Sequence, residues 1–207
     1  MTVFLSDADV RSVFDWPMAV CALRQAYAQG DGARRYPPRV VARGESSWLR
    51  TLTGVAADTE LMGAKLIAVS LAARSRDETP TLRGTWLRPG VTVVSIGSTL
   101  PEQREVDTDV LGRADVIVAD VVDEVLHDTG DLIAARAAGL DVAGKTCSLA
   151  DLVSGRHPGR TDPAEVALYK SVGSAVQDLA IASMCLDAAE RLGFGIHLPI
   201  SIQPVRK

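Results

Sequence analysis

The 207-residue sequence contains little cysteine, and what it has forms no recognisable site. Cys21, Cys147 and Cys185 are odd in number and widely spaced, and no pair forms a CxxC motif. This pattern indicates neither a disulfide framework nor a zinc site. Because Cys21 and Cys185 lie within apolar helical patterns, we expect both to be small buried side chains.

Clustered positive charge and long apolar runs are also missing. The formal net charge is −4, and the nearest approach to a basic patch is Arg34-Arg35, far short of a nucleic-acid footprint. The longest apolar run, Leu179 to Leu186, is too short to span a membrane, and the N-terminus has no signal pattern. We therefore expect a soluble, cytoplasmic protein that binds neither nucleic acid nor membranes.

The short motifs of common catalytic and nucleotide sites are absent. The sequence has no GxSxG, HExxH, Walker loop or GxGxxG. The three histidines, His127, His157 and His197, have no partner at metal-ligand spacing, so we assign no metal. A lone glycine after an apolar strand, Gly97, is weak evidence for phosphate binding.

What the sequence does contain is a set of apolar strands typical of an α/β protein. Residues 91–96 and 115–120 are short runs rich in β-branched residues. This pattern is typical of parallel strands that have helices on both faces of the sheet. Residues 40–42, 48–55 and 62–69 predict further strands. The loop 98–107 follows the first of these runs, at the edge of the sheet where α/β proteins bind ligands. It holds Arg104 and Glu105, either as an ion pair or as ligand contacts.

Helices are indicated near both ends of the chain. Ser6 is typical of an N-cap, and a second helix is predicted from Asp15 with a stripe of Trp16, Val20, Leu23 and Tyr27. The longest helix is predicted from Val172 to Leu192, with Gly193 as its stop.

Lys65, Arg39 and the start of the long helix are the candidates for chemistry. A lysine within an apolar strand either reaches solvent or enters a pocket, where it serves as a proton donor, base or Schiff-base nucleophile. Arg39, at a strand entrance, is either a surface residue or a clamp for a carboxylate. Ser171 and Gly173 open the helix, as a plain cap and packing residue or as contacts to an anion.

Three blocks of the sequence resemble the ornithine cyclodeaminase/mu-crystallin family. The first comprises residues 4–6 (FLS), 38–40 (PRV) and 64–66 (AKL). The second comprises 78–80 (ETP), 84–90 (GTWLRPG), 97–98 (GS), 104–107 (REVD) and 113–120 (RADVIVAD). The third is 170–178 (KSVGSAVQD).

The resemblance implies a fold and roles for several residues. It implies an α/β (α+β overall) chain: the family's substrate and dimerisation domain at 1–76 and 163–207, and a remnant of a Rossmann-type parallel sheet at 77–162. Arg39 matches the arginine that holds the substrate carboxylate, and Lys65 matches the active-site lysine. The segment 171–178 matches the region near the nicotinamide, and Thr99 stands where cyclodeaminases carry a catalytic aspartate. A homodimer is implied as well.

The sequence departs from the family where the nucleotide core should be. Only residues 66–77 stand in place of a long piece that carries a further substrate arginine and the GxGxQ phosphate loop. A dinucleotide needs backbone N–H groups at a helix N-terminus, with glycine to let it approach, and no stretch supplies that set. We therefore expect no NAD(P) cofactor.

Three functions follow as hypotheses. The first is a cofactor-independent enzyme that isomerises, cyclises or eliminates from a small amino or imino acid through Lys65. In it, Arg39, Thr99, Arg104, Ser171 and Gly173 bind the substrate. The second is a non-catalytic protein that binds a small acid or a partner. The third is an NAD(P)-dependent imine or amino acid oxidoreductase.

Overall fold

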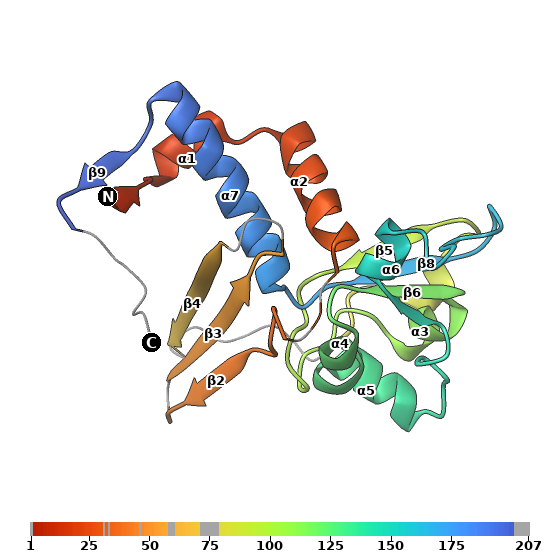
Figure 1. Ribbon diagram of the computed structural model, residues 1–207. Helices are drawn as coiled ribbons and strands as arrows, with labels where there is room; N and C mark the ends of the chain where they lie inside the picture. The colour runs from red at the N-terminus through yellow and green to blue at the C-terminus, as the bar shows by residue number, and fades with distance from the viewer. Residues whose placement is uncertain are drawn as a thin grey trace.

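A computed structural model describes residues 2–30, 32, 34–45, 47–57, 61–70 and 79–200. It contains a three-stranded antiparallel sheet, a four-stranded parallel sheet and a two-stranded pair (Figure 1). This mixed α/β architecture confirms the predicted fold class. Residues 71–78, which include Glu78 of the second block and most of the short segment 66–77, lie outside the described residues. No helix among the described residues is long and apolar enough to cross a membrane.

The N-terminal elements are fixed by local capping. Strand β1 (Thr2–Phe4) leads into α1 (Asp7–Val13) and α2 (Trp16–Ala28). Ser6 forms a capping box, in which its hydroxyl accepts from the backbone N–H of Asp9 at 3.2 Å and Asp9 accepts from Ser6 N at 2.9 Å. Asp15 caps α2 by accepting from Met18 N at 2.9 Å. Both predicted helix starts are confirmed.

The predicted apolar stripe of α2 is wrong for Trp16 and Val20 and right for Tyr27, which is only 2% exposed. Trp16 is 75% exposed and Val20 is 54% exposed, whereas Ala19 is buried. In its first half α2 packs against α7 (Ala175–Leu192) through small side chains such as Ala19 and Ala22, which allow a close approach, while Trp16 and Val20 are exposed. At its end, Tyr27 packs against Val176 of α7. Cys21 is on the exposed side too, so its predicted burial is wrong, while Cys185 is buried as expected.

The antiparallel sheet consists of β2 (Val40–Arg43), β3 (Ser47–Val55) and β4 (Met62–Ser70), in that order. One face packs against α7, and the other carries exposed apolar side chains. Helix α7 comes close to the sheet because the paired glycines Gly54 and Gly63 leave room for Leu179. Gly193 ends α7 in the left-handed region with φ 74°, as predicted.

The parallel sheet has the order β5-β8-β6-β7, with bounds Thr92–Ser95, Ala167–Lys170, Val116–Ala119 and Thr146–Ser148. Its connections contain the short helices η1 (Gly84–Trp86), α3 (Thr108–Arg113), α4 (Val122–Asp128), α5 (Gly130–Ala137) and α6 (Leu149–Val153). The core between this sheet and its helices includes Val110, Leu111, Ile117 and Leu132. Asp107 caps α3 by accepting from Val110 N at 2.9 Å.

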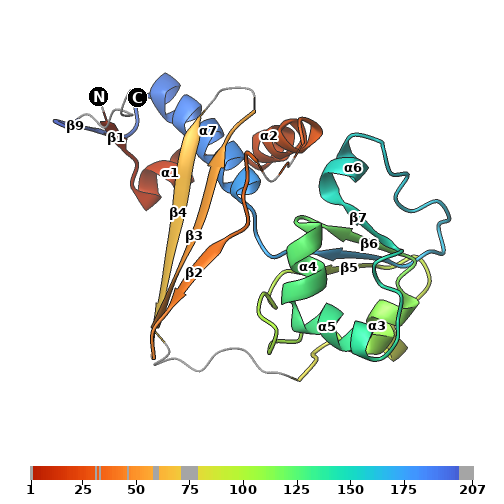
Figure 2. The same ribbon diagram turned by 60° about the horizontal axis from the view of Figure 1, so that its bottom comes forward.

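Two long-range pairings show how the chain returns on itself. Strand β8 lies between β5 and β6, although the predicted division assigned residues 163–207 to the other part. Near the C-terminus, β9 (Ile196–Leu198) pairs with β1. Figure 2 shows α4 on the side of the parallel sheet that faces β2 and β3. The division of the chain into domains stays a prediction.

Candidate functional site

Strand register places four cationic side chains on the inner face of the antiparallel sheet. Directly paired residues share a face, and side chains alternate along a strand. Val41 pairs with Arg50, Arg43 with Trp48, and Leu52 with Lys65. The cations on this face are therefore Arg39, which directly precedes β2, together with Arg43, Arg50 and Lys65. The sequence singled out only Arg39 and Lys65.

Arg39 is buried against a carboxylate of the parallel-sheet part. Its Nη2 lies 2.5 Å from Oε2 of Glu124, and each side chain is 8% exposed. The backbone N–H of Arg39 also donates to Oε1 of Glu124, at 3.2 Å. The first turn of α4 thus fixes the entrance of β2. Arg39 is therefore not the surface residue of one sequence-based interpretation, and its role as a clamp for a substrate carboxylate stays a prediction.

Lys65 pairs with the long helix. Its Nζ lies 3.0 Å from Oδ1 of Asp178, with side chains 46% and 35% exposed. The ammonium is therefore neither free in solvent nor enclosed in a pocket. It is held at an accessible point where β4 meets α7.

Arg50 joins these two ion pairs into one charged cluster. Burial is the main cause that lowers the pKa of its guanidinium, and nearby Arg39 lowers it further, whereas Glu124 and Asp178 act in the opposite direction. The guanidinium carbon lies 5.5 Å from the centre of the Trp48 ring. The alternation Trp48, Arg50, Leu52 was the available signal for this residue, because it shares its face with Lys65.

A cavity of about 220 Å³ opens beside this cluster. Arg39 and Thr99, two of the predicted substrate-binding residues, both line it, together with Arg43 and Arg50. The remaining lining residues are Val41, Trp48, Leu100, Pro101 and Asp128. A neighbouring cavity of about 480 Å³ shares Arg39 and includes Leu52, Asp120, Glu124 and Gly173. Lys65, Arg104 and Ser171 line neither cavity.

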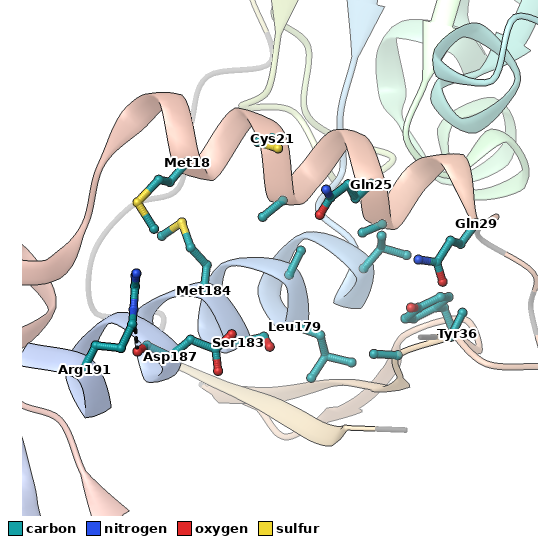
Figure 3. Close-up of a pocket in the computed structure, with 16 residues that line it drawn as sticks. Met18, Cys21, Gln25, Gln29, Tyr36, Leu179, Ser183, Met184, Asp187 and Arg191 are labelled. Carbon is teal, nitrogen blue, oxygen red and sulfur yellow. Dashed lines mark hydrogen bonds between the residues drawn. The ribbon is translucent and has the colours of Figure 1, made fainter. Parts of the chain in front are cut away.

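A separate groove of about 510 Å³ runs between α2 and α7 (Figure 3). Its walls are mainly small and apolar, with Met18, Cys21, Leu179 and Met184 among them. Figure 3 shows Asp187 and Arg191 at one end and Tyr36 at the other. None of the predicted site residues lines this groove, so the candidate site is the arginine cavity despite its smaller volume.

Ser171 and Gly173 are held by the buried carboxylate of Asp120. Ser171 Oγ donates to Asp120 at 2.6 Å, and the backbone N–H groups of Val172 and Gly173 donate at 3.0 and 2.8 Å. The hydroxyl of Ser171 is therefore engaged, and α7 begins later than the predicted Val172, with Ser174 as its cap. The predicted capping role of Ser171 is wrong.

The glycine after β5 is also closed by a carboxylate. Glu105 accepts from Gly97 N at 2.8 Å and from Ser95 Oγ at 2.6 Å, and a Cβ on Gly97 would meet a carboxylate oxygen of Glu105. A pyrophosphate needs free N–H groups and no adjacent negative charge at this edge of a parallel sheet. With Glu105 and Asp120 in place, the described residues do not fit the pyrophosphate of a dinucleotide.

A buried ion pair lies next to Ser95, at the end of β5. Lys170 and Asp131 are both fully buried, and Lys170 Nζ lies 2.8 Å from Asp131 Oδ2 and 2.8 Å from Ser95 Oγ. Within the described ranges, no group of three or more His, Cys, Asp or Glu is placed to hold a metal ion.

Curated relatives match part of the chain. Mouse ketimine reductase mu-crystallin is 29% identical over 123 residues, which are 59% of this chain and 35% of that protein. The Delta(1)-pyrroline-2-carboxylate reductase of Bacillus cereus is 32% identical over 110 residues, 53% of this chain and 34% of the reductase. The matched segments span about a third of the length of these relatives.

The fold and a family model agree with these matches. The structure of Thermococcus litoralis Delta(1)-pyrroline-2-carboxylate reductase, in complex with NADH and L-proline, superposes with a TM-score of 0.84 at 15% identity, covering 95% of this chain and 100% of that one. Residues 52–192 match the model of the ornithine cyclodeaminase/mu-crystallin family, which is more than half of the chain. As the resemblance of its three blocks predicted, the chain belongs to the ornithine cyclodeaminase/mu-crystallin family.

Proposed function

We propose that this chain acts on a small amino or imino acid, in the interconversion of imino and amino acids. The observation that carries the proposal is the register of the antiparallel sheet, which places Arg50 and Lys65 on one face, with Arg39 at the entrance of β2 in the same cavity as Arg50. Thr99, after β5, completes the cavity beside them. The names of the relatives, a ketimine reductase and a pyrroline-2-carboxylate reductase, support the reductive direction over the cofactor-independent reaction predicted from the sequence.

In this proposal the two kinds of cation have different tasks. A guanidinium offers a planar fork to a carboxylate, so the arginines bind and orient the substrate. Lys65 carries a proton that its ammonium can give to an imine nitrogen or take back from an amine. The Oδ1 atom of Asp178, 3.0 Å from Lys65 Nζ, orients the lysine side chain.

Reduction of an imine requires a hydride donor, which in nicotinamide enzymes is NAD(P)H. The described residues do not fit its pyrophosphate, because Glu105 and Asp120 already bind the N–H groups at the sheet edge. The activity of the whole protein stays a proposal, since the matches span about a third of the relatives.

The same occupied N–H groups favour a second candidate. In it, Lys65 acts as acid and base without a nucleotide, and isomerises, cyclises or eliminates from the same class of substrate. Conversion of an imino acid to its enamine is one such step, because it only moves a proton from carbon to nitrogen. A protein that binds the acid without turning it over is the non-catalytic alternative.

The deciding experiment incubates the purified chain with Δ1-pyrroline-2-carboxylate, with and without NADH or NADPH. Absorbance of the reduced nicotinamide and proton NMR of the acid are followed. Turnover only with nucleotide supports the oxidoreductase, and turnover without it supports the second candidate. Binding without turnover in either condition supports the non-catalytic protein.

A variant series links the result to the site. Lys65→Met should lower turnover at least about 100-fold, the usual contribution of a positioned acid or base. Arg11→Met is the matched control, since its ion pair with Asp7 is 77% and 80% exposed and distant in the fold. Full activity of Lys65→Met would refute the role of this lysine.

A further inference from the structure

The arginine cavity contains more positive charge than a simple amino acid needs. Three guanidinium groups, Arg39, Arg43 and Arg50, line it. Arg39 is neutralised by Glu124, and Asp128 is the acidic residue among the lining side chains. Two carboxylates thus face three guanidinium groups, and one positive charge is left over.

The uncompensated charge belongs to Arg43 and Arg50. Neither forms an ion pair with any described residue, whereas Arg39 and Lys65 each do. Nε of Arg50 is buried and has no hydrogen-bond partner within the described part of the chain. A buried donor without an acceptor costs free energy, which an anion in the cavity would recover.

Arg50 is also oriented before any ligand arrives. Its guanidinium lies over the Trp48 ring, with the carbon 5.5 Å from the ring centre. Trp48 lines the same cavity and pairs with Arg43 across the hairpin. A planar fork held against an aromatic ring loses less freedom when it binds a carboxylate.

We propose that Arg50 and Arg43 bind the second carboxylate of a dicarboxylic amino or imino acid. This inference rests on the proposed function and narrows its substrate class. An amino acid with one carboxylate has no net charge and leaves the excess positive charge unpaired. One with two carboxylates has a net charge of about −1 at neutral pH, which matches the excess. The volume of about 220 Å³ suits a short acid and is below that of a drug-sized site.

The test compares L-aspartate with L-asparagine by isothermal titration calorimetry. The two have nearly the same shape and differ in whether the side chain is a carboxylate or an amide. Because a hydrogen bond to a charged group contributes more than a neutral one, aspartate should bind about tenfold or more tightly. L-Alanine and L-proline are titrated as acids with a single carboxylate.

Variants assign the preference to the arginines. Arg50→Gln should reduce the aspartate-to-asparagine ratio to near one, while Arg24→Gln removes an exposed arginine of α2 and should leave the ratio unchanged. If Arg50→Gln fails to fold by circular dichroism, Arg43→Gln, at the exposed end of β2, serves instead.

The outcomes separate the two proposals. Equal binding of aspartate and asparagine to the wild type would overturn the dicarboxylate inference and leave the proposed function intact, provided that alanine or proline binds. A preference that survives in Arg50→Gln and Arg43→Gln would overturn the assignment to these arginines. Failure of all four acids to bind would overturn the proposed function and this inference together.

Discussion

Lys170 and Asp131 form the most deeply buried ion pair of the described structure. Both are fully buried, and Asp131 also accepts from the backbone N–H groups of Glu105 and Val106. A charge taken out of water is tolerated because every one of these contacts is present. The pair therefore fixes the carboxyl end of β8 against the loop after β5.

Loss of one partner should be costly. Lys170→Met keeps most of the side-chain volume but leaves Asp131 without its counter-charge, and we expect a loss of about 3–5 kcal/mol in the free energy of unfolding. Urea denaturation measures it, with Arg11→Met of the exposed pair expected to cost less than about 1 kcal/mol. Equal stabilities of the two variants would contradict the prediction.

Glu105 should make stability depend on pH. Burial acts to raise the pKa of its carboxyl, but hydrogen bonds from Ser95 and from the backbone of Gly97 and Ser98, with the charge of Lys170, lower it overall from 4.5. A lowered pKa in the folded state means that the stabilisation is complete well above pH 4.5. It is lost as the pH falls through the folded-state value.

The measurement is urea denaturation at neutral pH and at several values below 4.5. The wild type should lose stability across this interval more steeply than Glu105→Gln, which cannot titrate at this position. Parallel curves for the two proteins would argue against a stabilising ionised Glu105.

The partners of these side chains were the hardest part to predict. Arg39 and Lys65 were found because one is an arginine at a strand entrance and the other a lysine within an apolar strand, and both match the first block of the family resemblance. Glu124 is 85 residues from Arg39, Asp178 is 113 from Lys65, and Asp131 is 39 from Lys170. Such contacts depend on the order of the strands in the sheet. The hydrophobic periodicity of a single segment does not reveal that order. Arg104 stays a predicted substrate contact, outside both cavities.

At the scale of elements, close packing between α7 and the antiparallel sheet depends on glycine. A Cβ on Gly63 would lie 2.5 Å from Cδ2 of Leu179, and one on Gly54 would lie 2.8 Å from the Tyr36 ring. Side chains at these positions would push α7 from the sheet. That distance matters for the site, because Asp178 on α7 holds Lys65 on β4.

Gly63→Val should therefore destabilise the fold by about 1–3 kcal/mol, as overpacking of a tight contact does. It should also weaken binding of any amino acid at the site, because Lys65 and Asp178 move apart. Ala64→Val, the next residue on the exposed face of β4, is the control and should change stability by less than about 0.5 kcal/mol. Thermal and urea unfolding give both numbers.

Helix ends were predicted well where their causes are local. The side chains of Ser6 and Asp15 and the backbone of Gly193 act within three or four residues of themselves, so sequence alone identifies them. The start of α7 was placed too early because the hydroxyl of Ser171 binds Asp120, from another strand. The stripe of α2 failed at Trp16 and Val20 because the small side chains of Ala19 and Ala22 make that part of the contact with α7, whereas Tyr27 is buried as predicted.

At the scale of the whole molecule, the outer face of the antiparallel sheet is apolar and uncovered. Val40 is 67% exposed, Leu49 43%, Met62 62% and Leu66 67%. Contiguous apolar surface of this kind marks an interface more often than a free surface. It supports the predicted homodimer, with the second copy on this face.

A charged side chain on the outer face of the antiparallel sheet should separate the two copies of the proposed dimer. We expect the wild type to elute as a dimer in size-exclusion chromatography with light scattering, and Leu66→Arg to elute as a monomer. Trp16→Arg, which changes an exposed aromatic on α2, should remain dimeric. A monomeric wild type, or a dimeric Leu66→Arg, would place the interface elsewhere or exclude it.

The fold class and the family were predictable because the apolar runs and the three blocks remain. The function was less predictable. The missing phosphate loop predicts a reaction without a cofactor, whereas the names of the relatives are those of reductases. The structure adds a physical reason to expect weak nucleotide binding. Backbone N–H groups at the edge of the parallel sheet already donate to Glu105 and Asp120, which are carboxylates of the chain itself.

The contacts of Asp120 have one more consequence, for how the protein unfolds. The chain passes from β8 into α7 through residues 171–174. Asp120, directly after β6, accepts hydrogen bonds from the hydroxyl of Ser171 and from the backbone N–H groups of Val172 and Gly173. These bonds join the parallel sheet to the start of α7, which packs against the antiparallel sheet. The two sheets should therefore melt in one cooperative transition, and the amide protons of Val172 and Gly173 should exchange with solvent only as fast as the whole molecule unfolds.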